Sequence, residues 1–153
     1  MAISSSQLET WSHQGAITNS ATTYNSIKTA IESSNSLIKD RDHKVYLQGS
    51  YKNSTNIRGN SDVDVVLQLN STFRSDLNSL SEKDKSVYHS KYPDAKYNWP
   101  DFRRDVLSTL REYYGASQVT EGDKSIKIGA SSNRLASDVV VCITYRKYIS
   151  MDP

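Results

Sequence analysis

The stretch "LQGSYKNSTNIRGNSDVDVVLQL", residues 47–69, decides the fold and raises the main chemical question. A glycine-serine pair, Gly49 and Ser50, precedes a polar segment, and two aspartates then interrupt an apolar run. Alternate residues of a β-strand point to the same side of a sheet. Asp62 and Asp64 therefore share one face, while Val63, Val65 and Leu67 face the core.

Two carboxylates on one strand face need a partner. Like charges repel, and an unpaired buried carboxylate is costly. A divalent cation between them removes both costs, and Mg²⁺ typically uses a few carboxylates plus substrate phosphates. Asp138 precedes a second apolar run, "VVVCI". If its strand lies beside residues 62–69, three carboxylates converge on one or two metal ions, which can activate a hydroxyl and hold a leaving phosphate.

The glycine-serine pair is suited to a phosphate. Gly49 lets the backbone approach an anion closely, because it has no Cβ. Ser50 can open a short helix, whose N-terminus presents free N–H groups and a positive dipole end. We therefore expect a phosphate tail at Gly49 and Ser50, next to the carboxylates.

A long first helix is expected from residue 4 to about residue 38, because apolar residues recur on one face at helical spacing. Leu8 and Trp11 are out of phase with that face, and Gly15 lies between the two sets, so we expect a bend or break there. The face consists of Ile17, Tyr24, Ile27 and Ile31.

Five strands are expected. The first is "VYLQG" at residues 45–49, and the second is residues 62–69, which "NST" at residues 70–72 should end. The other three are "SQVTE", "SIKIG" and "SDVVVCITY", with "EGDK" as a hairpin turn between the first two.

Two helices are expected between the second and third strands. Ser81, followed by Asp84, resembles a helix start. Pro100 suits the first turn of a clearer helix that Gly115 should end. Its buried stripe is Phe102, Val106, Leu110 and Tyr113 or Tyr114. The fold class is therefore mixed α/β or α+β, a mixed sheet backed by the long N-terminal helix and this second helix.

Composition excludes several classes of protein. The 153 residues suit one domain, and the net charge of +2 lacks the dense basic patch of a strong duplex nucleic-acid binder. Cys142 is the only cysteine, so no internal disulfide or cysteine metal site forms, and we read it as a core residue. No secretory signal and no apolar stretch of membrane-spanning length is visible. We expect a soluble, cytoplasmic protein without membrane contact.

The segment from Gly49 to the aspartates resembles the signature of the polymerase-β-like nucleotidyltransferase superfamily. The chain is most similar to the bacterial cGAS/DncV-like nucleotidyltransferases, through its long first helix with Trp11, "YNWPDFRRDV", "GDKSIKIG" and "DVVVCITYRKY". These enzymes make cyclic di- and oligonucleotide second messengers in antiphage defence. The proline often found after the third aspartate is replaced here by Val141 and Cys142.

The resemblance implies roles for particular residues. Asp62, Asp64 and Asp138 would be catalytic and bind Mg²⁺ or Mn²⁺, and Gly49 and Ser50 would hold the triphosphate of a nucleoside triphosphate substrate. It also implies a regulatory or effector partner from the same defence operon. Members usually carry a further helical lobe, so residues 1–153 are expected to be a catalytic core cut from a longer protein.

Other interpretations stay open. The Asp62–Asp64 pair could be solvated on an edge strand. Lys124 could contact the triphosphate, although a surface position on the hairpin is the favoured interpretation. The same core could transfer a nucleotide to a protein, an RNA end or a small-molecule hydroxyl. It could also be a non-catalytic nucleotide-binding or scaffolding domain. The presence of all three aspartates argues against loss of activity.

Overall fold

The computed structural model describes residues 4–48 and 62–152, without the side chains of residues 8–19; Gly49 and Ser50 lie outside the described residues. None of the described helices is long and apolar enough to cross a membrane. The elements in chain order are α1 (Ser5–Glu32), β1 (His43–Gln48), β2 (Val63–Asp76), α2 (Glu82–Lys91), α3 (Trp99–Tyr114), β3 (Val119–Glu121), β4 (Ile126–Ile128) and β5 (Ser137–Lys147).

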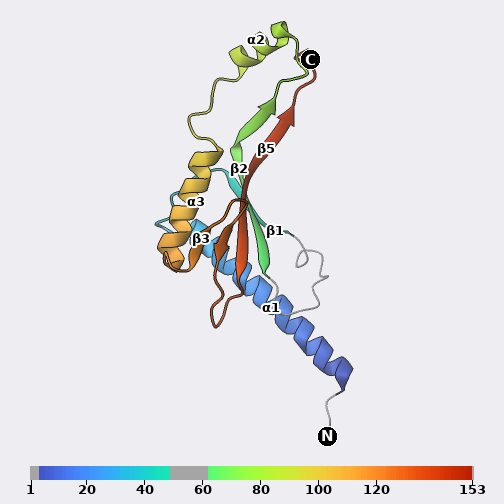
Figure 1. Cartoon of the computed structure of the whole chain (residues 1–153), viewed down its shortest axis with the longest axis vertical. Helices are drawn as coiled ribbons and strands as arrows, with labels where there is room; N and C mark the ends of the chain where they lie inside the picture. The colour runs from blue at the N-terminus through green and yellow to red at the C-terminus, as the bar shows by residue number, and fades with distance from the viewer. Residues whose placement is uncertain (1–3, 49–61, 153) are drawn as a thin grey trace.

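These strands form one mixed sheet in the order β1-β2-β5-β4-β3 (Figure 1). The neighbours β2 and β5 run parallel, and the other three pairings are antiparallel. The predicted mixed α/β class is confirmed, as is the expectation that the strand of Asp138 lies beside that of Asp64. The parallel pair at the centre of the sheet is what brings these distant parts of the sequence together.

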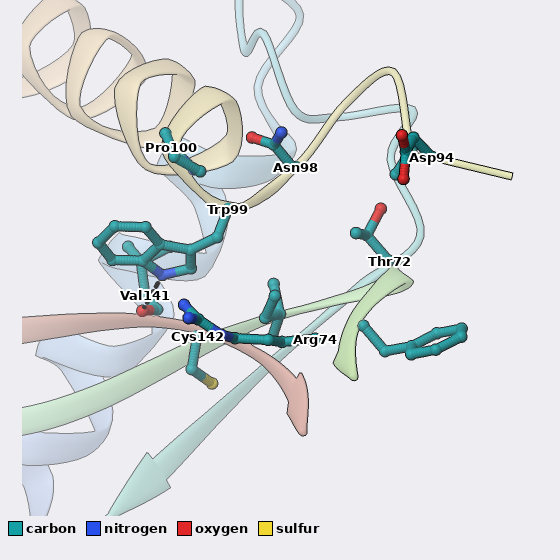
Figure 2. Close-up of a pocket in the computed structure, with 11 residues that line it drawn as sticks. Thr72, Arg74, Asp94, Asn98, Trp99, Pro100, Val141 and Cys142 are labelled. Carbon is teal, nitrogen blue, oxygen red and sulfur yellow. Dashed lines mark hydrogen bonds between the residues drawn. The ribbon is translucent and has the colours of Figure 1, made fainter. Parts of the chain in front are cut away.

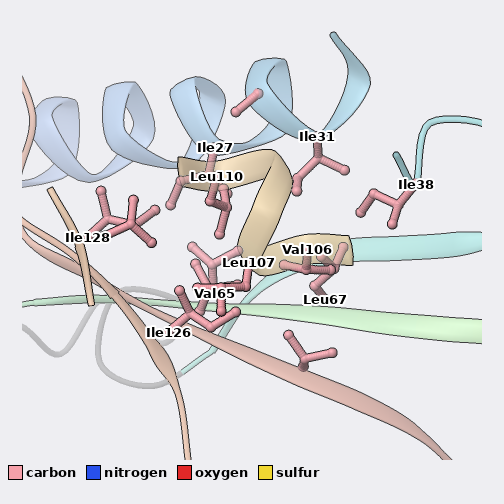
Figure 3. Close-up of a cluster of buried hydrophobic side chains, with 14 of the residues drawn as sticks. Ile27, Ile31, Ile38, Val65, Leu67, Val106, Leu107, Leu110, Ile126 and Ile128 are labelled. Atoms are coloured by element: carbon pink, nitrogen blue, oxygen red, sulfur yellow. The ribbon is translucent and has the colours of Figure 1, made fainter. Parts of the chain in front are cut away.

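The core lies between one face of the sheet and the helices α1 and α3 (Figure 3). Ile27 and Ile31 of α1 are fully buried, as predicted from their spacing. Phe102, Val106 and Leu110 of α3 are fully buried too. Burying a side chain of this kind contributes roughly 1.5–3 kcal/mol, so the two helices are tied firmly to the sheet. The sheet's other face carries the carboxylates.

The ends of α3 follow from its sequence. The Asp101 carboxylate accepts a hydrogen bond from the backbone N–H of Asn98 at 3.1 Å, which satisfies a donor just before the first turn. Pro100 lies in that turn, where its missing N–H costs nothing. Gly115 ends the helix at a φ of 92°, a conformation that favours glycine. Both predicted boundaries are therefore confirmed.

The expected end of α1 and a break at Gly15 are both wrong. The helix ends at Glu32 rather than near residue 38, because Ser33 leaves the helical conformation and its N–H bonds back to the Ala30 carbonyl. Serine competes for backbone hydrogen bonds and so favours helix ends over interiors. The helix also runs through Gly15 without a break.

The predicted end of β2 at residues 70–72 is also wrong. The strand continues to Asp76, with a register shift between Leu69 and Phe73. Beyond the shift β5 still offers pairing partners, beginning with Thr144 opposite Phe73. Backbone pairing with β5 therefore overrides the turn tendency of the polar side chains.

The extended β2 and β5 ends form a two-stranded arm, residues 73–76 and 144–147, with α2 at its tip (Figure 1). The hydroxyl of Ser81 accepts a hydrogen bond from the Asp84 N–H at 3.1 Å, which confirms the predicted helix start. Tyr88 is buried against Tyr148, with ring centroids 5.1 Å apart. Aromatic packing thus fastens α2 to the arm.

Candidate active site

One row of side chains crosses the whole sheet on the face opposite the helices. Asp64 pairs in register with Gln48 on one side and with Asp138 on the other. Asp138 in turn pairs with Lys127, which pairs with Thr120. Residues opposite one another in register point to the same side. We call this set (Gln48, Asp64, Asp138, Lys127 and Thr120) the carboxylate row.

Asp64 occupies a position where its charge is unfavourable. It is half-buried, between the fully buried Val63 and Val65. Burial raises the pKa of its carboxyl group, and the nearby charges of Asp138 and Asp62 raise that pKa further. Both effects disfavour the ionised form. A cation at this position would reverse them.

Asp138 is held by two donors from the neighbouring hairpin strand. The Ser125 hydroxyl donates a hydrogen bond to its Oδ1 at 3.1 Å. The Lys127 ammonium lies 3.4 Å from the same oxygen. The Asp138 side chain is 22% exposed, whereas that of Lys127 is 60% exposed. Both contacts therefore come from β4 or its edge and both use Oδ1.

Asp62 lies just before β2 and is exposed. With Asp138 and Lys127 it lines a hollow of about 370 Å³ that reaches along the β4 side of the sheet to Gln118 and Gly129. Asp138 therefore adjoins both of the other aspartates. It is the register partner of Asp64, and it lines the hollow together with Asp62. Within the described parts of the chain, however, no three acidic, histidine or cysteine side chains are arranged to hold a metal ion.

The donor chemistry of the row nevertheless fits a divalent cation. Mg²⁺ is usually bound by one or two carboxylates together with substrate phosphates, so a third protein ligand is not required. Asp64 and Asp138 could supply two hard oxygen ligands from adjacent, hydrogen-bonded strands. Burial first, and then the charges of Asp138 and Asp62, raise the pKa of Asp64, and a cation beside the carboxylate would offset these effects.

A larger hollow, of about 860 Å³, lies farther along β5, about 10 Å or more from Asp138 at the usual rise per strand residue (Figure 2). Trp99 lines it and donates its indole N–H to the Val141 carbonyl at 2.8 Å. Cys142, expected in the core, instead lines this hollow and is half-buried. Burial raises the pKa of its thiol.

Sequence reasoning missed Ser125 and Lys127. The pattern "SIKIG" shows that Lys127 alternates with two buried isoleucines, which is typical of a strand with one polar face. It does not show which residue lies opposite. Only the β4–β5 register identifies Asp138 as that residue.

Comparison with known proteins identifies the family of the chain. Residues 27–128 match the model of the nucleotidyltransferase domain family. The chain belongs to that family. A cyclic UMP-AMP synthase from Rhodothermus marinus is 49% identical over 148 residues, 97% of this chain and 48% of the relative. The cyclic nucleotide synthase CdnE01 of Staphylococcus haemolyticus is 38% identical over 98% of this chain and 50% of the relative.

The solved structure of the Rhodothermus marinus CdnE c-UMP-AMP synthase, with Apcpp and Upnpp, superposes with a TM-score of 0.74. It is 48% identical and covers 96% of this nucleotidyltransferase chain and 47% of its own. The resemblance to the cGAS/DncV-like group is confirmed by these relatives. The chain spans about half the length of the relatives it matches.

Proposed function

We propose that this protein is a metal-dependent nucleotidyltransferase that joins nucleoside triphosphates into a cyclic di- or oligonucleotide and releases pyrophosphate. The observation that carries the proposal is the register pairing of Asp64 with Asp138 on parallel strands. That pairing places two carboxylates on the open face of a fold shared with cyclic nucleotide synthases.

The chain's own residues bind and orient the reactants. Asp64 and Asp138 would hold Mg²⁺ or Mn²⁺, with Asp62 as a further ligand. The rigid β2–β5 pair fixes the separation of the two strand carboxylates. Gly49 and Ser50, which lie outside the described residues, would bind the triphosphate.

The transfer itself joins two nucleotides. A 3′- or 2′-hydroxyl oxygen of one nucleotide bonds to the α-phosphorus of another, the bond to the β-phosphate breaks, and pyrophosphate leaves. The hydroxyl proton is lost to solvent. A second transfer within the linear product closes the ring. A bound divalent cation would lower the pKa of the attacking hydroxyl and offset the phosphate charge.

Three further proposals rest on the resemblance alone. Residues 1–153 would be the catalytic core, and a helical lobe would complete the nucleotide cleft. The protein would act in the cytoplasm in bacterial antiphage defence. A regulatory protein or effector from the same operon would be its partner.

The test is the product formed by the longest natural form of the chain. It is incubated with all four α-labelled nucleoside triphosphates and Mg²⁺, and the products are treated with phosphatase and separated. An Asp64→Asn/Asp138→Asn double variant runs in parallel. Asp40→Asn is the matched control, because Asp40 is exposed before the opposite end of β1.

A phosphatase-resistant nucleotide made by the wild type and Asp40→Asn, but not by the double variant, supports the proposal and names the bases. Label transferred to a protein, an RNA or a small molecule would overturn cyclic synthesis in favour of another transferase. Triphosphate binding without Mg²⁺ and without any product would show a non-catalytic binding domain.

A further inference from the structure

Lys127 is the only cation of the carboxylate row, and the row is covered entirely by described residues. It lies opposite Asp138 in the β4–β5 register, and Asp138 lies opposite Asp64 in the β2–β5 register. The order of charges across three neighbouring strands is therefore negative, negative, positive. Lys127 is adjacent to the place where a cation would bind.

The contact between the Lys127 ammonium and the Asp138 carboxylate is weak enough for another cation to replace the ammonium. Its 3.4 Å distance to Asp138 Oδ1 is longer than a tight charge-assisted hydrogen bond, and the lysine side chain is mostly exposed. Exposed lysine–carboxylate pairs are weak, since solvent screens them. A divalent cation can therefore displace the ammonium without disturbing the fold.

Ser125 makes a different contact with the same carboxylate. Its hydroxyl is uncharged and donates to Oδ1 at 3.1 Å. Such a hydrogen bond can persist when a cation binds the carboxylate, because its donor is uncharged, whereas the Lys127 ammonium on the same oxygen is repelled by the cation. Groups that orient a metal-binding carboxylate in this way raise its affinity for the metal.

We propose that Lys127 is a positioning residue that occupies the Asp138 carboxylate until a divalent cation replaces it, and that Ser125 keeps this carboxylate oriented in both states. The inference rests on the proposed function, because it assumes that Asp64 and Asp138 bind a cation. It assigns opposite effects to two neighbouring residues: Lys127 opposes cation binding, whereas Ser125 favours it.

Binding of Mn²⁺ alone tests the proposal without any nucleotide. The natural full-length chain is titrated at fixed ionic strength, and free Mn²⁺ is measured by electron paramagnetic resonance. Lys127→Met removes the charge, and Lys127→Arg keeps it. Ser125→Ala removes the hydroxyl, and Ser125→Thr keeps it. Lys124→Met is the matched control, because it removes the same charge from the same hairpin outside the row.

Lys127→Met should lower the Mn²⁺ dissociation constant about two- to fivefold, the range of an exposed ion pair. Ser125→Ala should raise it about tenfold. Lys127→Arg, Ser125→Thr and Lys124→Met should each stay near the wild-type value. A merely structural role for Lys127 or Ser125 would change the thermal midpoint without Mn²⁺ and leave the binding constant unchanged.

The proposal is overturned if Lys127→Met leaves Mn²⁺ affinity unchanged or weakens it, or if Lys124→Met strengthens it equally. The nucleotide-product assay, run on the same wild-type sample, reports separately on the proposed function. Product formation with unchanged Mn²⁺ constants in Lys127→Met and Ser125→Ala overturns the roles of both residues and leaves the proposed function standing. Absence of Mn²⁺ binding by the wild type overturns this inference and leaves the product assay to decide the activity.

Discussion

Asp64 and Asp138 lie directly opposite each other on the adjacent parallel strands β2 and β5, although 74 positions separate them in the sequence. Successive strand residues alternate between faces, so a slip of one residue in this register would turn one carboxylate toward the core. Buried neighbours on both strands, including Val65 and Val139, prevent such a slip. The apolar core therefore fixes the geometry of the candidate active site.

The first prediction concerns the pH dependence of stability. The pKa of Asp64 is raised in the folded chain, by burial first and then by Asp138 and Asp62. The folded state thus holds this proton more tightly than the unfolded state. The contribution of Asp64 to the free energy of unfolding is present at pH values below the ordinary carboxyl pKa and is lost as pH rises through the raised value.

Asp64→Asn should remove the loss of unfolding free energy that Asp64 causes as the pH rises. In urea titrations with a chelator present, the difference in unfolding free energy between variant and wild type should grow in favour of the variant as pH rises from about 3.5 to 7. The lowered pKa of Asp76 produces the opposite slope, but it is common to both proteins and cancels. Parallel pH profiles would contradict the account.

Trp99→Phe tests the bond between α3 and β5. The variant loses the hydrogen bond from the indole N–H to the Val141 carbonyl, because phenylalanine has no N–H to donate to that oxygen. The expected loss of unfolding free energy is about 1–2 kcal/mol. Tyr113→Phe, at an exposed position of the same helix, serves as the control and should change stability little. Equal effects would contradict a specific role for the indole.

Phe102→Ala tests the packing of α3 on the sheet. Phe102 is fully buried in the core cluster, so truncation should cost about 3–5 kcal/mol of unfolding free energy. Val87→Ala, on the exposed side of α2, should cost no more than about 0.5 kcal/mol. A loss below about 1 kcal/mol for Phe102→Ala would show that this helix does not pack as described.

The arm should open more readily than the core. An isolated two-stranded ribbon is only marginally stable, and α2 is fastened to it largely by Tyr88, Tyr92 and Tyr148. Tyr88→Ala should speed amide hydrogen exchange in α2 by at least about tenfold and leave α3 unchanged. Equal acceleration in both helices would show that the arm and the core unfold together.

The sequence predicted elements whose causes are local. The start and end of α3 follow from Asp101, Pro100 and Gly115, and the start of α2 follows from Ser81. The alternation of Val63, Asp64 and Val65 correctly assigned the two faces of β2. In each case the deciding residues lie within one turn or one strand of the feature.

Structural features that depend on residues far away in the sequence could not be predicted. The extension of β2 to Asp76 requires backbone pairing with β5, which polar side chains do not reveal. The contact of Lys127 with Asp138 depends on the β4–β5 register, which is set by tertiary packing. Cys142 was wrongly assigned to the core, because an apolar run does not show which face is covered. The roles of Gly49 and Ser50 stay predictions.

Pyrophosphate release from nucleoside triphosphates in the presence of Mg²⁺ tests the central claim most directly. It is measured for the longest natural form of the chain and for Asp64→Asn, Asp138→Asn and the control Asp40→Asn. The account predicts that each of the first two variants lowers the rate at least about 100-fold, while Asp40→Asn retains the wild-type rate. A wild-type rate in Asp64→Asn or Asp138→Asn would contradict the assignment of these carboxylates to nucleotidyl transfer.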